Sequence, residues 1–457
     1  MTAGAATGIP QLDDTIVAIA TPIGRGALAV VRLSGPNAFP IARKHVQAWP
    51  PEPRVVHLSA IHDENESLDQ ALVTLFPGPN SFTGDDTVEI STHGGYMVPT
   101  SIVAALISSG ARQALPGEFA RRAVLNGKLD ILQAEAIGDL IDARSRAMQH
   151  AALGQLDGGL SHRLLELRDD LIELEALIAY DIDFPEEDDG PVPRERIERA
   201  AGELRASLAS LLATATAGEL IREGAVVVIA GPPNAGKSSL FNALLGRSRA
   251  IVTEIPGTTR DALEAVIDSG KFPLRLVDTA GLRDSSDPIE RMGIEVSERY
   301  LVGAHVVLAC AEDATGLTQT VSEVAKLSNA PIVRVRTKAD LVINRDEEAG
   351  DDLVFVSAEM GTGLQGLLDA TNRLIAGNYG DISPDLPMLT SARHRKALTV
   401  ALNELGQFER AWSETKLPAP VASVHLRTAV YVLEELIGAV DVEDVFDRVF
   451  SSFCVGK

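Results

Sequence analysis

The fold of the middle of this chain is decided by the stretch Gly231-Pro232-Pro233-Asn234-Ala235-Gly236-Lys237-Ser238. It matches the phosphate-binding loop pattern G-x-x-x-x-G-K-[ST]. The apolar run 225–230 before it predicts a buried parallel strand, and residues 239–245 after it predict a helix, which argues against a coincidental glycine-rich turn. Glycines let backbone N–H groups surround an anion, and the helix N-terminus adds partial positive charge. We expect Lys237 to neutralise the β- and γ-phosphates and Ser238 to bind Mg²⁺.

Motifs at the ends of the next strands distinguish GTP from ATP. The strand predicted at 272–278 ends in Asp278-Thr279-Ala280-Gly281, where Asp278 would hold Mg²⁺ and the Gly281 N–H would meet the γ-phosphate. A later strand ends in Thr337-Lys338-Ala339-Asp340. The Asp340 carboxylate would accept both the N1–H and the exocyclic amine of guanine, whereas adenine would leave it unpaired. With Ser357-Ala358 as the last guanine-contacting loop, these motifs predict a doubly wound α/β domain similar to translation-factor-like P-loop GTPases.

The residue that orients the attacking water is not obvious. Leu282 follows the Asp-Thr-Ala-Gly motif, where many P-loop GTPases have a glutamine, and its side chain cannot hydrogen-bond to water. The sequence identifies no arginine finger. Asn234 offers an oxygen that would hold a monovalent cation beside the phosphates, and Glu290 offers a carboxylate that would orient water. Without a family resemblance, Glu290 is more simply interpreted as a surface helix residue.

Length, charge and cysteine content exclude several classes of protein. The chain has 457 residues, which suggests roughly three domains. Its 41 Lys and Arg against 64 Asp and Glu give a net charge of −23, so any RNA partner requires a local basic face or a second protein. The two cysteines, Cys310 and Cys454, argue against a disulfide scaffold and a structural zinc site. Neither a signal peptide nor a membrane-spanning run is recognisable, so we expect a cytoplasmic protein that does not enter a membrane.

The pattern of apolar and polar residues changes along the chain. It predicts a multidomain protein: an N-terminal α+β domain, an all-α helical domain, and an α/β P-loop GTPase (Ras-like G) domain inserted into the helical one. The predicted boundaries are 1–127, 128–222 for the first helical part, 223–377 for the inserted domain, and 378–457 for the second helical part. An acidic, proline-containing break at 181–193 is expected to be a solvated loop. The helical stripes consist of Leu164, Leu167, Leu171, Leu174, Ile178, Ile197, Ala201, Leu204, Leu208, Leu211, Leu398, Leu402, Leu405, Phe408, Leu426, Ala429, Leu433 and Leu436.

Two further motifs narrow the family. Gly257-Thr258-Thr259-Arg260-Asp261 resembles switch I of a group of bacterial GTPases, and the ending Cys454-Val455-Gly456-Lys457 resembles the C-x-G-K terminus of the tRNA-modification GTPase MnmE (TrmE) family. The resemblance runs from about residue 14 to 457. The other segments that carry it are Asp14–Ala18, Asn80–Gly84, His93–Gly95, Gly117–Ala123 and Asn126–Asp130.

The resemblance implies a function as well as a fold. MnmE-like proteins bind a tetrahydrofolate in the N-terminal domain, form homodimers through it, and hydrolyse GTP in a potassium-dependent reaction. With an FAD-containing partner of the MnmG (GidA) kind, in a heterotetramer or larger complex, they add a (carboxymethyl)aminomethyl group to C5 of the tRNA wobble uridine. For this chain the resemblance therefore implies GTP, Mg²⁺, K⁺ and a folate derivative as cofactors.

Site residues are carried over position by position. The implied catalytic residues are Glu290, Cys454 and Lys237. The implied Mg²⁺ ligands are Ser238 and Thr259, and the implied K⁺ ligands are Asn234, Thr253, Ile255 and Thr258. The folate contacts are Arg32, Glu89, Lys128 and Lys457. The GTP-binding residues are Asn234, Ala235, Gly236, Lys237, Ser238, Ser239, Thr253, Glu254, Ile255, Pro256, Gly257, Thr258, Thr259, Asp278, Thr279, Ala280, Gly281, Thr337, Lys338, Ala339, Asp340, Ser357 and Ala358.

The folate contacts also make chemical sense. Arg32 and Lys128 suit the anionic glutamate tail of a folate, and Glu89 suits the N–H donors of the pterin, although each alone is more simply interpreted as a surface charge. For Cys454, one interpretation is a thiol that acts as acid or nucleophile, and the other is a buried apolar residue at a helix end. Cys310, inside an apolar run, is expected to be a core-strand residue.

Two alternative functions remain open at this stage. One is a regulatory switch GTPase in ribosome assembly, which would have no use for a folate site. The other is a folate-dependent aminomethyltransferase with a regulatory GTPase that works without a flavoprotein. The chain has no dinucleotide-binding G-x-G-x-x-G of its own, so redox chemistry is expected to need another chain.

Overall fold

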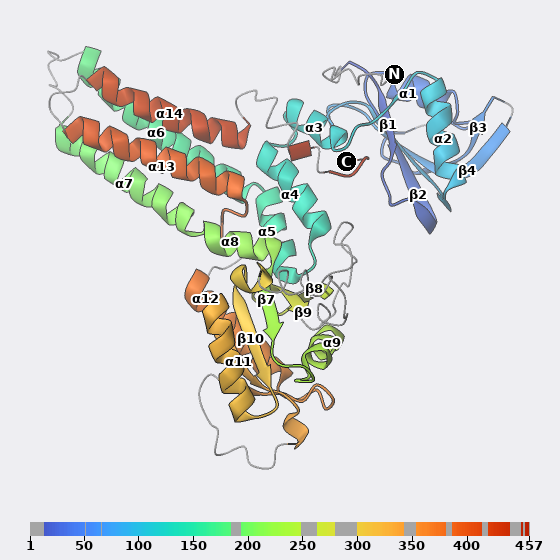
Figure 1. The fold of residues 1–457 in the computed structure, drawn as a ribbon. Coiled ribbons are helices and arrows are strands. Elements are labelled where there is room, and N and C mark those ends of the chain that lie inside the picture. The colour runs from blue at the N-terminus through green and yellow to red at the C-terminus, as the bar shows by residue number, and fades with distance from the viewer. Residues whose placement is uncertain are drawn as a thin grey trace, which may run out of the picture. The chain divides into compact units, whose positions relative to one another are not determined.

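The computed structural model describes residues 13–50, 52–64, 66–183, 193–247, 263–278, 299–341, 353–380, 386–413, 419–438, 449–450 and 453–456. Contacts divide the chain into two compact units. The first unit combines Met1–Gly138 with Ile437–Lys457, and the second consists of Asp139–Leu436. Figure 1 shows the elements of both units along the chain.

The first unit is built on a six-stranded sheet with the order β3-β4-β5-β2-β1-β6. Only the β1–β6 pair in it is parallel, and the other pairs are antiparallel. Helices α1 and α2 bury one face of the sheet in an apolar core, and the opposite face carries the more polar residues of β2 and β5. This is the predicted α+β arrangement. The strands and helices are β1 (Ile16–Ile19), β2 (Gly24–Ser34), α1 (Ala38–Arg43), β3 (His57–Asp63), β4 (Glu66–Phe76), β5 (Thr87–Gly95), α2 (Met97–Ser108), β6 (Arg112–Gln113) and α3 (Glu118–Leu125).

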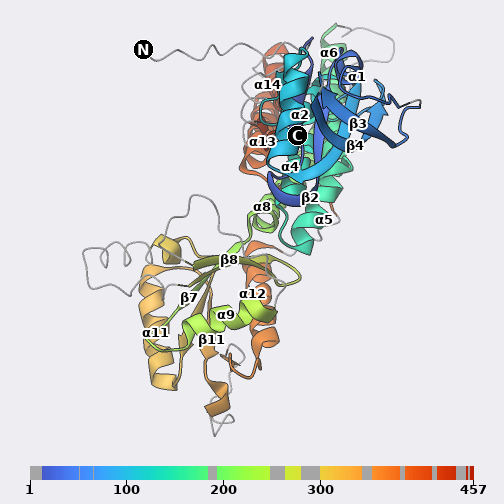
Figure 2. The same cartoon turned by 90° about the vertical axis from the view of Figure 1, so that its right-hand side faces the viewer.

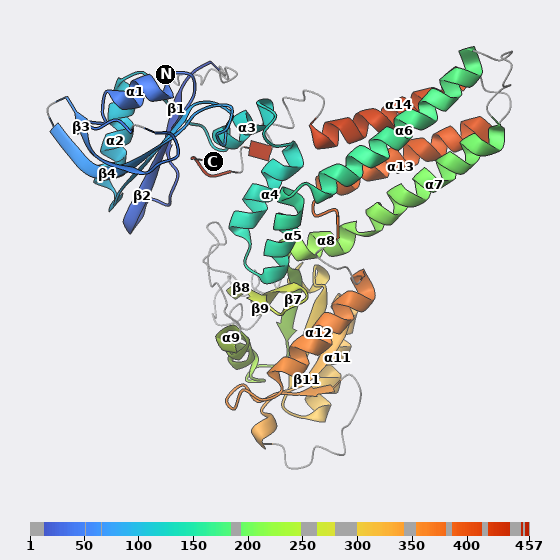
Figure 3. The same cartoon turned by 180° about the vertical axis from the view of Figure 1, so that it is seen from behind.

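The helical part contains the long helices that the apolar stripes predict. In Figure 3, α6, α7, α13 and α14 run alongside one another, and α7 contacts both α6 and α13. All the stripe residues are buried except Leu402, which is half-buried, because their three- and four-residue spacing places them on the inner face of each helix. The helices are α4 (Ile131–Asp142), α5 (Arg146–Leu156), α6 (Gly159–Asp183), α7 (Arg194–Ala213), α8 (Ala215–Glu223), α13 (Ala392–Ser413) and α14 (Ala419–Ile437).

The inserted part is a six-stranded sheet with the order β12-β11-β10-β7-β9-β8, parallel except for the β8–β9 pair. Helices α9 and α12 cover one face and α11 covers the other (Figure 2). The central strands β7 and β10 are buried at every position, as continuous apolar runs predict. The elements are β7 (Ala225–Ala230), α9 (Lys237–Arg247), β8 (Leu263–Asp268), β9 (Pro273–Asp278), β10 (Val306–Ala311), α11 (Ala314–Leu327), β11 (Ile332–Arg336), a 3-10 turn (Ala339–Leu341), β12 (Leu353–Phe355) and α12 (Leu364–Tyr379).

Three expectations differ from this architecture. The predicted helical part 378–457 is divided, because Ile437–Lys457 is grouped with the first unit. The predicted loop at 181–193 begins too early, since α6 continues to Asp183. The sequence patterns also did not predict α1, β3, α3 and the two-residue β6, which are too short for a clear periodicity. Within the described ranges, no helix combines the length and the apolar character needed to cross a membrane.

Candidate functional site

The phosphate loop connects β7 to α9 at the carboxyl end of the sheet. Lys237 is almost fully buried, and its Nζ donates to the carbonyl oxygens of Gly231 at 3.0 Å and Pro232 at 2.8 Å. Asn234 is exposed and has a positive φ of 62°. The loop therefore curls around its own lysine, which is placed to meet an anion with its ammonium group.

Two of the three groups predicted to bind Mg²⁺ are brought together. The Ser238 Oγ donates to Oδ2 of Asp278 at 2.7 Å, although the residues are 40 positions apart. Asp278 ends β9 and is fully buried, whereas Ser238 is the second residue of α9 and is exposed. A hydroxyl and a carboxylate oxygen at the phosphate loop are the hard donors that Mg²⁺ prefers, so these residues fit the metal.

The guanine motifs line a cavity of about 320 Å³ at the same edge of the sheet. Its wall residues are Gly236, Ser239, Leu240, Thr337, Lys338, Asp340, Leu341, Val356, Ala358 and Glu359. Lys338 has a positive φ of 52° and forms an ion pair with Glu312. A hydrogen bond from Ser357 lowers the pKa of Asp340, because it stabilises the ionised carboxylate.

Ser357 therefore has a role that sequence reasoning missed. It was predicted to contact guanine, but its side chain is almost fully buried and supports Asp340. Its Oγ also accepts from the Met360 N–H at 3.2 Å, which tightens the turn after β12. The Ser-Ala pair after a strand could have been interpreted as a support for the guanine carboxylate as well as a contact to the base.

Strand β10 contains Cys310, and its last residue, Ala311, binds Thr337. The Thr337 N–H and hydroxyl donate to the Ala311 carbonyl at 3.0 Å and 3.2 Å, which joins the guanine motif to the end of this strand. Cys310 is fully buried in β10, and burial raises the pKa of its thiol to about 12. The prediction of a core-strand cysteine is confirmed.

Several predicted site residues lie outside the described residues, and the predictions for them stand as made. They are Thr253, Glu254, Ile255, Pro256, Gly257, Thr258, Thr259, Thr279, Ala280, Gly281, Glu290 and Lys457.

The first unit holds a second polar site on the exposed face of its sheet. Arg32 and Glu89 are paired across strands β2 and β5. Nε and Nη2 of Arg32 lie 2.9 Å and 2.8 Å from Oε1 of Glu89. The Arg32 guanidinium also lies against the rings of Phe82 and Phe119, with centroids 5.5 Å and 5.7 Å away. The two predicted folate contacts thus form one ion pair held between aromatic side chains.

The C-terminal residues also reach this site. Nη1 of Arg32 donates to the Gly456 carbonyl at 3.5 Å, and the side chain of Cys454 is exposed. Exposure contradicts the interpretation of Cys454 as a buried apolar residue. Lys128 is exposed two residues after Asn126, whose Nδ2 donates to the Thr83 carbonyl at 2.7 Å.

Phe82, Phe119 and Asn126 had no predicted role, although they belong to segments that carry the family resemblance. Each is placed by contacts that only the fold reveals: the two rings by Arg32, and Asn126 by the Thr83 carbonyl.

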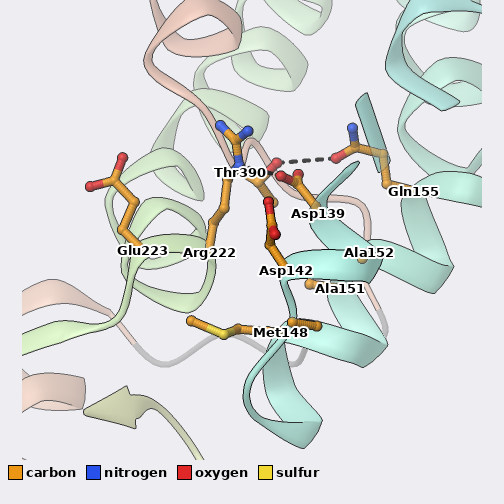
Figure 4. A pocket seen from close by; sticks show the side chains of 10 residues that line it. Asp139, Asp142, Met148, Ala151, Ala152, Gln155, Arg222, Glu223 and Thr390 are labelled. Atoms are coloured by element: carbon orange, nitrogen blue, oxygen red, sulfur yellow. Dashed lines mark hydrogen bonds and ion pairs between the residues drawn. The ribbon is translucent and has the colours of Figure 1, made fainter. Parts of the chain in front are cut away.

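A different cavity, of about 370 Å³, lies among the helices of the second unit (Figure 4). Its walls include Asp139 and Asp142 of α4, Gln155 of α5, Arg222 of α8, and Thr390. Arg222 Nε lies 2.8 Å from Oδ1 of Asp139, and the Thr390 hydroxyl donates to Gln155 at 3.1 Å. The first contact joins α8 to α4, and the second joins α5 to the segment that follows the inserted domain. The lining shares no residue with the guanine cavity.

Comparisons with known proteins cover nearly all of the chain. A family model described as the MnmE helical domain matches residues 131–454, and one described as the GTP-binding protein TrmE N-terminus matches residues 15–128. A tRNA modification GTPase MnmE from Heliobacterium modesticaldum is 40% identical, over 98% of this chain and 100% of its own. Those from Aquifex aeolicus and Akkermansia muciniphila are 37% and 42% identical, over 98% and 97% of this chain and 100% and 99% of their own.

Among solved structures, the G domain of the T. maritima FeoB iron transporter is 27% identical over 33% of this chain and 98% of its own, with a TM-score of 0.27.

Proposed function

Because this chain belongs to the family of tRNA modification GTPases called MnmE, we propose that it hydrolyses GTP to drive modification of the tRNA wobble uridine. The product is a (carboxymethyl)aminomethyl group at uridine C5. One observation carries the GTPase part of this proposal. Lys237, the Ser238–Asp278 pair and the Asp340 carboxylate all lie at the carboxyl edge of one sheet, beside a cavity that the guanine motifs line.

Hydrolysis needs charge neutralisation and an oriented water. Lys237 neutralises the β- and γ-phosphates, and Ser238, Thr259 and Asp278 would hold Mg²⁺, which would compensate the charge on the phosphate oxygens. Asn234, Thr253, Ile255 and Thr258 would hold K⁺, which would supply the positive charge that an arginine finger provides in other GTPases. Glu290 orients the attacking water, since Leu282 has no group that can do so.

Cation dependence tests this division of roles. We expect GTP turnover to be at least about tenfold faster in potassium than in sodium, because one well-placed charge is worth this much or more in phosphoryl transfer. We expect Glu290→Ala to lower kcat by about 10² to 10⁴. Equal turnover in both salts would contradict the K⁺ site, and unchanged kcat in the variant would remove Glu290 from the mechanism.

The first unit provides the modification site in this proposal. Arg32, Glu89, Lys128 and Lys457 bind a tetrahydrofolate derivative, which supplies the one-carbon unit. Because Arg32 and Glu89 form one ion pair, they would contact the same part of a bound folate rather than its glutamate tail and its pterin separately. The Cys454 thiol takes part as acid or nucleophile, and its exposure makes it accessible to a substrate.

Partners complete the reaction. A second copy of the chain pairs through the N-terminal domain, and an FAD-containing MnmG (GidA)-like protein supplies the redox chemistry. The net charge of −23 supports the need for a partner in binding tRNA.

Mass spectrometry of tRNA nucleosides from a strain that lacks this protein tests the function as a whole. We expect loss of the C5-modified wobble uridine and recovery with the wild-type chain but not with Lys237→Ala. Normal levels of the modified nucleoside in the deletion strain would contradict the proposal. They would favour the alternative function, a regulatory switch GTPase in ribosome assembly.

A further inference from the structure

The C-terminal tail, residues 453–456, is held against the first unit by its backbone. The Gly117 N–H donates to the Cys454 carbonyl at 3.3 Å, and Pro116 and Val455 form an isolated antiparallel bridge. In Figures 1 and 3 the C-terminal end of the described chain lies beside α3. The tail therefore docks on the turn 115–117 that precedes α3, while the side chain of Cys454 faces solvent.

Gly456 fixes the end of the tail. It is buried, has a φ of +105°, and lies so close to β1 that an added Cβ would be 2.6 Å from the Ile19 carbonyl oxygen. Its own carbonyl accepts from Arg32. The aromatic rings of Phe450 and Phe453 pack edge to face at 5.5 Å, beside the buried residues of α3 and α4. The tail is thus held by contacts on both sides of Cys454, through Phe453 before it and Gly456 after it.

The turn that receives the tail is itself held by a buried carboxylate. Oε2 of Glu118 accepts from the Leu115 N–H at 2.7 Å, which fixes the turn at its first residue. Glu118 is only 3% exposed, and it receives both terminal nitrogens of Arg112, at 3.1 Å and 2.6 Å. Arg122, which is 1% exposed, lies 3.3 Å from the same carboxylate.

Asp14 completes an ion cluster, which we define as Asp14, Arg112, Glu118 and Arg122. Its Oδ2 accepts from Arg112 at 2.6 Å, its Oδ1 pairs with Arg122, and its backbone carbonyl accepts from Arg122 at 2.6 Å. Burial by itself would raise the pKa of Asp14, but the hydrogen bonds from Arg112 and Arg122 outweigh it and leave the pKa below its usual value. Two carboxylates and two guanidiniums are thus paired under the turn.

We propose that Glu118, held by Arg112 and Arg122, is a positioning residue that sets the place of the Cys454 thiol beside the Arg32–Glu89 pair. The path runs from the ion cluster to the Leu115 N–H, through the turn to the Gly117 N–H, and on to the Cys454 carbonyl. Glu118 does not touch the reacting groups in this account. The inference rests on the proposed role of Cys454 in tRNA modification.

A double-mutant cycle on the full-length chain, assayed with its flavoprotein partner, tests the coupling. We expect Glu118→Gln and Cys454→Ser each to lower the turnover of tRNA modification by about tenfold or more, and the double variant to match Cys454→Ser within about twofold, since residues that act as a unit are not additive. Multiplied losses in the double variant would show an independent structural role and overturn the proposal.

Arg112→Lys keeps the positive charge but loses the planar guanidinium that pairs with the Glu118 carboxylate. Because Arg112 is 37% exposed, this variant is milder, and it replaces Glu118→Gln in the test if that variant does not fold. We expect it to lower modification turnover severalfold with little change in the KM for tRNA. GTP hydrolysis should stay within about twofold in both variants, because the cluster shares no residue with the nucleotide site.

Hydrogen exchange separates failure of this inference from failure of the proposed function. In Glu118→Gln the Gly117 amide should exchange about tenfold faster, because the turn that carries this amide is no longer held by the Glu118 carboxylate. Unchanged exchange would overturn the positioning role whatever the activity shows. Faster exchange, together with a Cys454→Ser variant of normal activity, would keep the docking but remove Cys454 from the reaction and with it this inference.

Discussion

The nucleotide site and the Arg32 site are built in different ways. At the nucleotide site, each group lies inside a short motif at the end of a strand, and the parallel sheet gathers these ends at one edge. At the Arg32 site, the guanidinium pairs with Glu89, 57 residues away, and contacts Gly456, 424 residues away. One site is specified by local patterns, and the other by contacts between distant segments. Changes to the first should act on tRNA modification through GTP binding and hydrolysis, whereas changes to the second should act through the docking of the tail.

The largest expected effect is on nucleotide choice. Asp340→Asn should prefer xanthosine triphosphate to GTP, because an amide can donate to the second ring carbonyl of xanthine but no longer accepts both guanine donors. We expect the ratio of kcat/KM values for the two nucleotides to change by about 10⁴. Asp369→Asn, an exposed change on α12 of the same domain, is the matched control. A variant that still prefers GTP would break the assignment of the guanine site.

Removal of the loop lysine comes next. Lys237→Ala should lower kcat for GTP by about 10² to 10³, the loss expected when one preorganised charge or donor is removed from a transition state. Lys326→Ala, in the last turn of α11, removes the same charge elsewhere in the domain and should leave kcat unchanged. Equal kinetics in the two variants would mean that Lys237 only supports the Gly231 and Pro232 carbonyls.

Substitution of Gly456 tests how strongly the Arg32 site depends on contacts between distant segments. In Gly456→Ala, alanine would have to adopt a positive φ, and its Cβ would lie 2.6 Å from the Ile19 carbonyl oxygen. The tail should therefore leave its place against the first unit. We expect about tenfold lower modification turnover and faster exchange of the Gly117 amide. Gly26→Ala is the control in the same unit, since its Cβ would meet its nearest atom at an ordinary 3.5 Å. Normal turnover in Gly456→Ala would show that the site does not need the tail.

The smallest expected effect is on stability in acid. The pKa of Asp14 is lowered in the folded state, so its pairing stabilises the fold above the unfolded pKa of about 3.9 and is lost as the pH falls through the lower folded pKa. Asp14→Asn should therefore reduce the free energy of unfolding at pH 7 by about 1 kcal/mol, and the difference from wild type should be smaller at about pH 3 than at pH 7. Urea unfolding at both pH values measures it, and a difference that grows in acid would contradict the sign.

The sequence predicted the nucleotide site well because its chemistry depends on local order. A strand, a glycine-rich loop and a helix in succession place Lys237 and Ser238, and the β7 bounds agree with the apolar run residue for residue. Asp340 is likewise placed by the end of its strand. The support of Asp340 by Ser357 was not predicted, because it depends on how the turn after β12 packs against the neighbouring motif.

The sequence by itself determined the three fold classes along the chain, the phosphate loop and the guanine motifs, because these follow from periodicity and from residue types at fixed spacing. Only the tertiary structure decided that Arg32 pairs with Glu89, that the ion cluster lies under the turn before α3, and that residues 437–457 join the first unit with Cys454 exposed. Strand register and long-range packing place these groups, and neither leaves a pattern within a short window of sequence.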